Sequence, residues 1–326
     1  MSKKRGKYMK YSGIAPEGTL LHTGENQSYI SSLTGLERAM RENKILEARA
    51  VMCDEDMNLH IDLNGICGII PKAECLLTSA NEEIKDIAII TRVGKPVCFK
   101  VTAIEPRAGG FCAILSRRAA QIECRSYYIS SLKVGDIIPA TVTHPDTFGA
   151  FVDIGCGICS LLCIDCISVS RISHPSDRLL PGDRIHVAVK TIDAESGRIF
   201  VTLKELLGTW EQNASEFCVG RTVTGIVRSI ESYGVFVELS PNLAGLAELR
   251  DDSTRRCIEV GNTVSVYIKS ILPDRMKIKL VLIDVDTAQK QKKPLRYYVD
   301  PAKVDHIERW DYSPVGCTKQ ICTIFE

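Results

Sequence analysis

The chain has 326 residues, of which 45% are hydrophobic and 25% are charged, a composition typical of folded globular domains rather than of disordered chains. This length is enough for two or three small domains, each with its own core. The net charge of +1 excludes a protein that coats duplex nucleic acid by charge alone. No run of eighteen or more apolar residues predicts a membrane span, and the basic start leads into no apolar signal core. We therefore expect a cytoplasmic protein that contacts no membrane.

The fourteen cysteines mostly stand singly in apolar, strand-like runs, as buried free thiols do in a reducing compartment. Cys156, Cys159, Cys163 and Cys166 are the exception because they follow one another closely. Zinc sites built from two cysteine pairs normally separate the pairs by a dozen or more residues, and here only three residues stand between Cys159 and Cys163. We expect no metal site and no cofactor.

Residues 1–43 begin with a basic, glycine-containing segment and continue into a predicted helix. The run Thr34-Gly35-Leu36-Glu37 has the pattern of a capping box, in which Thr34 accepts from an early helical amide and Glu37 reaches back. Leu36 and Met40 would then share one face of a short helix that ends near Asn43. We expect this helix to pack on the domain that follows.

Residues 44–124 alternate apolar runs with turn residues, a pattern that predicts a small all-β domain. The turn Asp54-Glu55-Asp56 separates the first two predicted strands, and Val93-Gly94-Lys95 opens the fourth. A fifth strand ends in Ser116-Arg117-Arg118. Polar residues mixed with spaced apolar ones then predict a helical connector over 125–132.

The next two domains contain a repeat. Phe148-Gly149-Ala150-Phe151-Val152-Asp153 returns as Tyr233-Gly234-Val235-Phe236-Val237-Glu238, and an earlier glycine, Gly135 or Gly220, precedes each copy at the same distance. Two aromatics three residues apart face opposite sides of a regular strand. The glycine between them permits a bulge or an unusual backbone angle that would bring both rings to one face.

These residues resemble the bacterial ribosomal protein S-one family, whose RNA-binding module occurs in tandem repeats. The similarity extends through Ser160-Leu161-Leu162, Pro181-Gly182-Asp183 and the run from Gly197 to Lys204. The resemblance implies a five-stranded antiparallel OB barrel that holds single-stranded RNA on one face. The predicted fold is therefore all-β, with three tandem five-stranded OB-fold barrels of S-one type and short helical connectors.

The predicted segments are 1–43 (basic segment and short helix), 44–124 (degenerate repeat), 125–132 (helical linker), 133–210 (best-preserved repeat), 211–217 (linker), 218–285 (third repeat) and 286–326 (basic linker and C-terminal tail).

Family members place two aromatics, a third-strand histidine, and an Asp and Arg flanking the last turn on the RNA face. Carried over by the resemblance, the second-repeat positions are Phe148, Phe151, Cys163, Asp193 and Arg198. Cys163 departs from the family's histidine, which removes a ring and a donor. Core packing is the alternative for the two phenyl rings, but their return in the third repeat favours surface stacking.

The third repeat keeps Tyr233 and Phe236, with Lys277 at the arginine position. Glu248 replaces the histidine, and Leu272 replaces the turn aspartate. A carboxylate on this face repels phosphate unless it accepts from a base amine. We predict weaker or more base-selective binding by this barrel.

Three further features complete the RNA-binding prediction. His174, between the third and fourth strands of the second repeat, is expected first to support local structure and second to contact RNA. The first repeat lacks the aromatic pair, with Met57 and His60 in its vicinity, so we predict a docking or spacer module, with RNA contact as the alternative. Trp210 is expected to anchor neighbouring modules.

In the C-terminal segment, Lys290, Lys292 and Lys293 are candidate phosphate contacts. The aromatics Tyr297, Tyr298, Trp310 and Tyr312 predict a tail that folds back onto a barrel.

The sequence predicts a non-enzymatic protein that binds single-stranded RNA, namely mRNA, at or near the small ribosomal subunit in translation. Small-subunit proteins are a second class of expected partner, and no small-molecule substrate is expected. The alternative is a protein-interaction scaffold of degenerate barrels, which the replacements at Cys163 and Glu248 and the neutral charge favour. An RNA-processing enzyme is disfavoured because the chain has no phosphate-binding loop, no HExxH pair and no carboxylate cluster outside turns.

Overall fold

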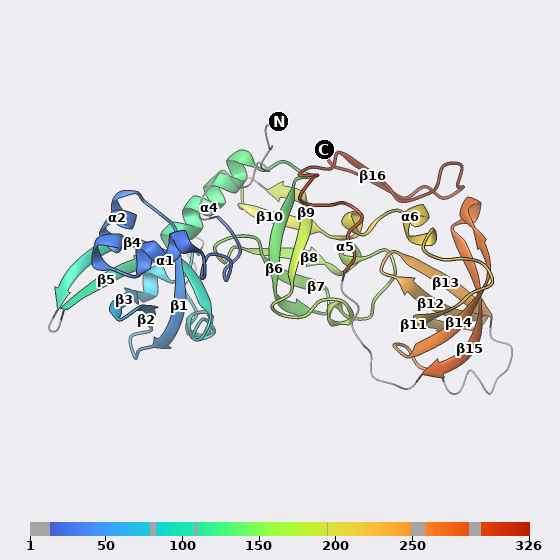
Figure 1. Ribbon diagram of the computed structural model, residues 1–326, viewed down its shortest axis with the longest axis horizontal. Coiled ribbons are helices and arrows are strands. Elements are labelled where there is room, and N and C mark those ends of the chain that lie inside the picture. The colour runs from blue at the N-terminus through green and yellow to red at the C-terminus, as the bar shows by residue number, and fades with distance from the viewer. Residues whose placement is uncertain (1–13, 79–82, 108–109, 194, 249–257, 287–294) are drawn as a thin grey trace.

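The computed structural model describes residues 14–78, 83–107, 110–193, 195–248, 258–286 and 295–326. Three barrels follow one another along the long axis of the molecule, in the order of the sequence (Figure 1). This confirms the predicted all-β fold of three tandem five-stranded barrels. The basic residues 1–13 and the lysines at 290, 292 and 293 lie outside the described residues.

The first barrel contains β1 (Leu46–Cys53), β2 (Leu59–Leu63), β3 (Ile66–Ile70), η2 (Lys72–Glu74), α3 (Asp86–Ile90), β4 (Pro96–Arg107) and β5 (Gly110–Ser116). The second contains β6 (Ile137–Asp146), β7 (Gly149–Asp153), β8 (Cys159–Cys163), α5 (Ile164–Ile167), η3 (Pro175–Asp177), β9 (Arg184–Asp193) and β10 (Arg198–Thr202). After η4 (Lys204–Leu207) and α6 (Trp210–Ala214), the third contains β11 (Thr222–Glu231), β12 (Gly234–Ser240), β13 (Leu243–Glu248), β14 (Thr263–Leu272), η5 (Pro273–Arg275) and β15 (Lys277–Asp286).

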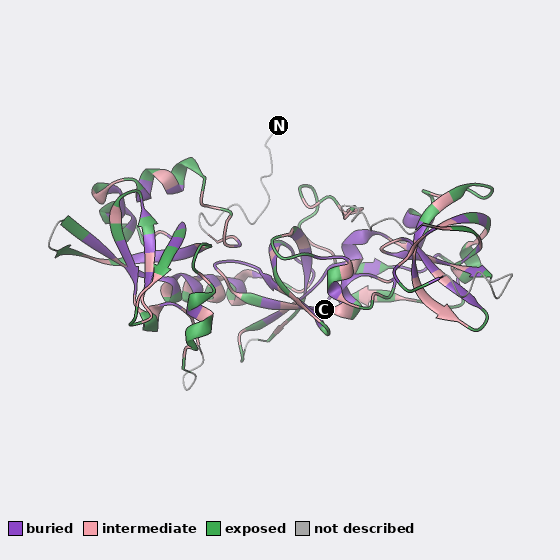
Figure 2. Cartoon of the chain, turned by 90° about the horizontal axis from the view of Figure 1, so that it is seen from below, coloured by how far each residue is buried: buried purple, intermediate pink, exposed green. Residues whose placement is uncertain are grey.

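All three barrels have the same strand order and close in the same way. Neighbouring strands pair antiparallel except at closure, where β3–β5, β8–β10 and β13–β15 pair parallel. The expected antiparallel barrel therefore closes through one parallel pairing in each repeat, because the third and fifth strands run in the same direction where they meet. Inward residues alternate with outward ones, so each barrel encloses an apolar core (Figure 2).

Two helices precede the first barrel, α1 (Gly24–Ile30) and α2 (Leu33–Arg41). Ser32 caps α2 by accepting from the Gly35 amide at 3.1 Å, so the predicted cap at Thr34 is two residues too late. Leu36 is buried in the core of the first barrel, as expected of a helix that packs on that domain. Met40 is 37% exposed and does not share the buried face.

The helix α4 (Arg117–Ser131) joins the first barrel to the second (Figure 1). It begins well before the predicted connector because the Ser116 side chain caps it by accepting from the Ala119 amide. Its Tyr128 hydroxyl donates to the Ile154 carbonyl at 2.5 Å, and Gln121 donates to the Cys156 carbonyl. The helix is thus part of the contact between the barrels rather than a free linker.

Buried charges complete the contact between the first and second barrels. Arg117, 1% exposed, donates to both carboxylate oxygens of Glu17 at 2.7 and 3.1 Å. The Glu17 amide in turn donates to the Asp153 carboxylate at 2.7 Å. Burial and the charge of Glu17 raise the pKa of Asp153 to about 8. Hydrogen bonds among the N-terminal segment, α4 and the second barrel thus satisfy these polar groups away from water.

A second buried charge cluster joins the second barrel to the third. Arg178, beside η3 in the second barrel, donates to both carboxylate oxygens of Glu238 on β12, at 3.0 and 2.8 Å. Arg228 on β11 donates to the same carboxylate at 2.6 Å and to Asp177 at 3.3 Å. Asn242 adds an uncharged link by donating to the carbonyls of Lys204 and Gly208.

The C-terminal tail spans the second and third barrels. Its β16 (Arg309–Asp311) and β17 (Cys322–Ile324) pair antiparallel. The Tyr297 hydroxyl accepts from the His186 amide in the second barrel, and Trp310 and Tyr312 are buried in the core of the third. The expectation that the tail folds back is confirmed, and it involves two barrels. Trp210, 2% exposed, lies in that third core as an anchor.

Among the described residues, no helix combines the length and apolar character needed to cross a membrane.

Candidate nucleic-acid interface

The second barrel presents two phenyl rings side by side. Phe148 lies in the turn just before β7, and Phe151 lies within that strand. The ring centroids are 5.7 Å apart and the planes meet at 85°, a favourable edge-to-face contact. Phe148 is 50% exposed and Phe151 is partly exposed. Neither ring belongs to the barrel core, so the core alternative does not hold for this pair.

The third barrel repeats this arrangement. Tyr233 precedes β12, and Phe236 lies within it. Their ring centroids are 6.3 Å apart with an interplanar angle of 87°. Tyr233 is 63% exposed, the larger exposure of the two leading rings. Both barrels therefore expose the edge of one aromatic ring and the face of another to solvent at the start of their second strand.

Of the two roles predicted for the glycine between the rings, the bulge is wrong, because it lies in the neighbouring strand, between Val142 and His144 of β6. The unusual backbone angle is found in the third barrel, where Gly234 has a φ of +158°. A Cβ on Gly149 would stand 2.5 Å from the Leu162 carbonyl oxygen, and one on Gly234 would stand 2.7 Å from that of Ala247. Glycine is needed because the adjacent strand approaches closely. The rings share a face because the first lies in the turn, outside the alternation of the strand.

The third-strand position lies opposite this glycine. Cys163 pairs with Gly149 across β7 and β8, and it packs partly buried against the core. In the third barrel Val235 pairs with Ala247, which places Glu248 opposite Gly234 at the exposed end of β13. The two departures from the family pattern thus occupy equivalent places, but only Glu248 presents a polar group to solvent.

The last turn of the second barrel holds Asp193 and Arg198, which pair across the β9–β10 hairpin. The Asp193 carboxylate accepts from the Ser196 hydroxyl and from the amides of Glu195 and Ser196. These bonds, that of the Ser196 hydroxyl first, lower the pKa of Asp193. Asp193 therefore shapes the turn, while Arg198 remains exposed beside it.

The third barrel has a different pair at the same turn. Lys277 pairs with Leu272 across the hairpin, as Arg198 pairs with Asp193. Lys277 is exposed at the start of β15, and a lysine there supplies a cation without the planar donor array of arginine.

His174 has the local structural role that was predicted first. It precedes η3, and its ring nitrogen Nδ1 accepts from the Ser176 amide at 3.1 Å. The same loop continues into Asp177 and Arg178, which contact the third barrel. His174 therefore has a local hydrogen-bond partner, and it lies on the loop through which the second barrel contacts the third.

The first barrel has the same framework, with Met57 and His60 at the positions of the ring pair. Its β1–β2 pairing places Met52 opposite His60, at the position where β6 and β7 place His144 opposite Phe151. His60 Nε2 lies 3.0 Å from an Asp54 carboxylate oxygen. As predicted, Met57 and His60 occupy the region of the aromatic pair, and they offer no equivalent stacking surface.

The four clustered cysteines separate in the fold. Cys159 and Cys163 lie at the two ends of β8, and Cys166 in α5 accepts from Lys190 Nζ at 3.1 Å. Cys156 is buried beside α4 instead. Within the described residues, no group of three or more His, Cys, Asp or Glu side chains is arranged to hold a metal ion.

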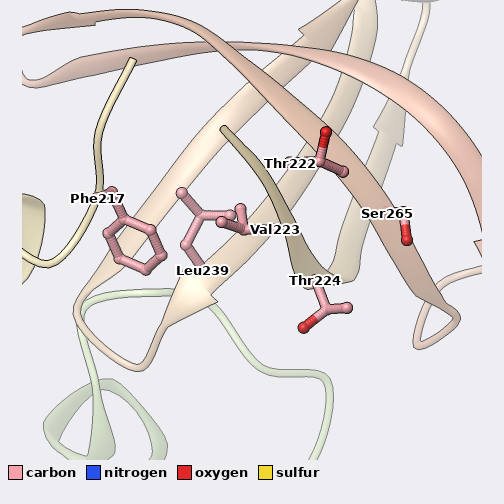
Figure 3. A pocket seen from close by; sticks show the side chains of 6 residues that line it. All are labelled: Phe217, Thr222, Val223, Thr224, Leu239 and Ser265. Carbon is pink, nitrogen blue, oxygen red and sulfur yellow. The ribbon is translucent and has the colours of Figure 1, made fainter. Parts of the chain in front are cut away.

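Figure 3 shows a pocket on the third barrel whose lining does not include the ring pair. It is lined by Phe217, Thr222, Val223, Thr224, Leu239 and Ser265. These six described residues include no carboxylate, imidazole, thiol or amine, so the pocket offers no acid and base pair for catalysis.

The comparisons with known proteins agree with this geometry. The model of the S1 RNA binding domain matches residues 131–204, the region of the second barrel. The small ribosomal subunit protein bS1 of Leuconostoc lactis is 30% identical over 237 residues, which are 68% of this chain and 52% of that protein. The bS1 homolog of Bacillus cereus is 32% identical, over 68% of this chain and 58% of that protein.

A third relative is matched over more of its length. The bS1 protein of Staphylococcus saprophyticus is 27% identical over 83% of this chain and 70% of its own length. Against the first matched proteins, the chain spans about half of the relative. The second barrel thus matches the S1 RNA binding domain, the three barrels share one topology, and the chain is a relative of small ribosomal subunit protein bS1 over most of its length.

Proposed function

We propose that this chain binds single-stranded RNA across its second and third barrels, and that it acts in translation by holding mRNA at or near the small ribosomal subunit, in the cytoplasm. The observation that carries the proposal is the recurrence of an exposed edge-to-face ring pair at one point of two barrels. Unpaired bases stack on such rings without regard to sequence, because every base has a π-face. The proposed role is binding without catalysis.

Two exposed cations support this mode of binding. Arg198 and Lys277 are exposed at equivalent turns of the two ring-bearing barrels, where each can meet a phosphate or a base edge. The net charge of +1 makes stacking the larger contribution, with a few placed cations adding to it. Linking two weak barrels then raises the apparent affinity through effective concentration.

The test is a titration of a fluorescent unstructured RNA, with binding followed by anisotropy. Changing Phe148 and Phe151 together to Ala should weaken binding by about 1–3 kcal/mol for each base that loses its ring. The matched control is Met57→Ala with His60→Ala in the first barrel, which should leave the affinity unchanged. Equal affinities for the wild type and the Phe148/Phe151 variant would refute the proposal.

The place of action requires a separate experiment. Cell extract is sedimented after mild nuclease treatment, and the protein is followed across the gradient. Movement with small ribosomal subunits supports a role at the subunit, whereas movement with free protein would restrict the proposal to RNA binding alone.

A protein-interaction scaffold is the second candidate, and the first barrel favours it because its framework is intact without the rings. Salt distinguishes the two functions. RNA binding should weaken as salt is added, whereas docking through apolar barrel surfaces should not.

A further inference from the structure

The outer face of the second barrel carries a row of three apolar residues across three strands. Phe151 on β7 pairs with Leu161 on β8, and Leu161 pairs with Phe200 on β10. Residues paired directly across strands point to the same face of a sheet. The row therefore begins at the inner ring of the known pair and ends at a third phenyl ring.

Phe200 points away from the core. Its neighbours Ile199 and Val201 are 4% and 1% exposed and belong to the barrel core. Phe200 between them is partly exposed and is not part of that core. Alternation along β10 thus places this ring on the surface.

The corresponding row of the third barrel ends differently. Phe236 pairs with Leu246, and Leu246 pairs with Lys279 on β15. Ile278 and Leu280, on either side of Lys279, are 2% and 1% exposed, whereas Lys279 is exposed. The third barrel therefore presents an ammonium group at the position where the second presents a phenyl ring.

The leucine in the middle of each row joins the end residue to the ring pair. A Cβ on Gly149 would lie 3.2 Å from Leu161 Cδ1, and one on Gly234 would lie 3.0 Å from Leu246 Cδ1. Each leucine side chain thus leans over the glycine that follows the exposed ring. An apolar side chain therefore stands between the ring pair and the fifth strand in each barrel.

We propose that this fifth-strand position makes the two barrels bind the same RNA by different chemistry: Phe200 stacks a further base, and Lys279 contacts a phosphate. The inference rests on the proposed function and adds two contact residues to it, together with the class of RNA group that each contacts. At this position the second barrel then adds a base contact that depends little on salt, and the third adds a salt-dependent phosphate contact.

The contributions of Phe200 and Lys279 are distinguished by how the RNA affinity of each variant changes with salt concentration. Affinity of the full chain for an unstructured fluorescent RNA is measured at several salt concentrations. Phe200→Ala should lower the affinity about tenfold at every concentration, leaving the slope of log K against log salt unchanged. Lys279→Ala should reduce the magnitude of that slope by about 0.7, the contribution of one phosphate contact on a single strand.

Exchanged side chains sharpen the test. Phe200→Lys should increase the magnitude of the slope by about 0.7, and Lys279→Phe should decrease it by the same amount. Phe200→Tyr retains a stacking ring and should bind as the wild type does. Phe200→Leu keeps apolar packing without the ring, so it should bind as weakly as Phe200→Ala even if the latter is less stable.

The outcomes distinguish this inference from the proposed function. If Phe200→Leu and Phe200→Ala bind as the wild type does while the Phe148/Phe151 variant loses affinity, the third stacking position is refuted and RNA binding stands. If Lys279→Ala leaves the slope unchanged, the phosphate contact is refuted. If the Phe148/Phe151 variant also binds normally, both the inference and the proposed function fail.

Discussion

The first barrel differs from the other two in the burial of one acidic residue on its second strand. Asp62, Asp153 and Glu238 each stand two residues after the inner position of the ring pair, at His60, Phe151 or Phe236. Asp62 is exposed, whereas Asp153 and Glu238 are 4% and 5% exposed. Each buried carboxylate contacts the segment or barrel that precedes its own. The same acidic position of the second strand therefore joins neighbouring segments in the second and third barrels, where another part of the chain packs on it.

The largest expected effect is at Glu238. Glu238→Ala leaves Arg178 and Arg228 without their shared carboxylate in a buried junction, and it should destabilise the third barrel by about 3–5 kcal/mol. Both tryptophans of the chain, Trp210 and Trp310, lie in that barrel's core. Their fluorescence during urea unfolding therefore reports on this barrel.

The matched control is Asp62→Ala in the first barrel, which should change stability by less than about 0.5 kcal/mol. Equal effects of the two substitutions would show that the buried junction does not distinguish these positions.

The next effect concerns the glycine that accompanies the rings. Gly149→Ala places a Cβ 2.5 Å from the Leu162 carbonyl oxygen, so the strands must separate, at a cost of about 1–3 kcal/mol. The position two residues before the inner ring is Asn58 in the first barrel, where no such approach requires glycine. Gly24→Ala in α1, where a Cβ meets nothing within 4 Å, is the control and should not destabilise. A neutral Gly149→Ala would contradict the close-approach explanation.

The acidic position also predicts a pH dependence. The pKa of Asp153 is raised to about 8 in the folded chain, above about 3.9 for an unfolded aspartate. The folded state therefore holds a proton that the unfolded state has lost, and stability should fall as pH rises from about 4 to about 8. The limit for one proton is about 1.4 kcal/mol per pH unit.

Urea unfolding followed by circular dichroism across this range measures the slope. Asp153→Asn should flatten it, whereas Asp62→Asn should leave it as in the wild type. A slope that survives Asp153→Asn would assign the dependence to another group.

The smallest expected effect is a gain. Met57→Phe with His60→Phe gives the first barrel a ring pair on an existing framework, and it should raise RNA affinity severalfold, about 1 kcal/mol. The nearby acidic turn at Asp54 limits the gain through repulsion of phosphate. Anisotropy titration measures it, with Met57→Leu and His60→Leu together as the apolar control. An unchanged affinity would show that rings on this framework are insufficient.

Much of this architecture was predictable because it repeats at short range. The barrels follow from alternating apolar residues, and the ring pairs from the return of Phe148 and Phe151 as Tyr233 and Phe236. The joints were not predictable, since Arg117 meets Glu17 and Arg178 meets Glu238 at separations of 100 and 60 residues.

Local patterns also misled in two places. The helix cap fell on Ser32, two residues before Thr34, because the Ser32 hydroxyl accepts from the Gly35 amide without the reciprocal Glu of a capping box. Phe200 was overlooked although its buried neighbours Ile199 and Val201 follow the alternation of a strand.

The junction between the second and third barrels has a consequence for any strand that lies along both. Phe236 stands two residues before Glu238, whose carboxylate accepts hydrogen bonds from Arg178 of the second barrel. The C-terminal tail also contacts the same two barrels. These contacts therefore hold the two ring pairs at a fixed distance from each other. A bound strand must bridge them with a constant number of nucleotides, so oligonucleotides shorter than that span can occupy only one pair at a time.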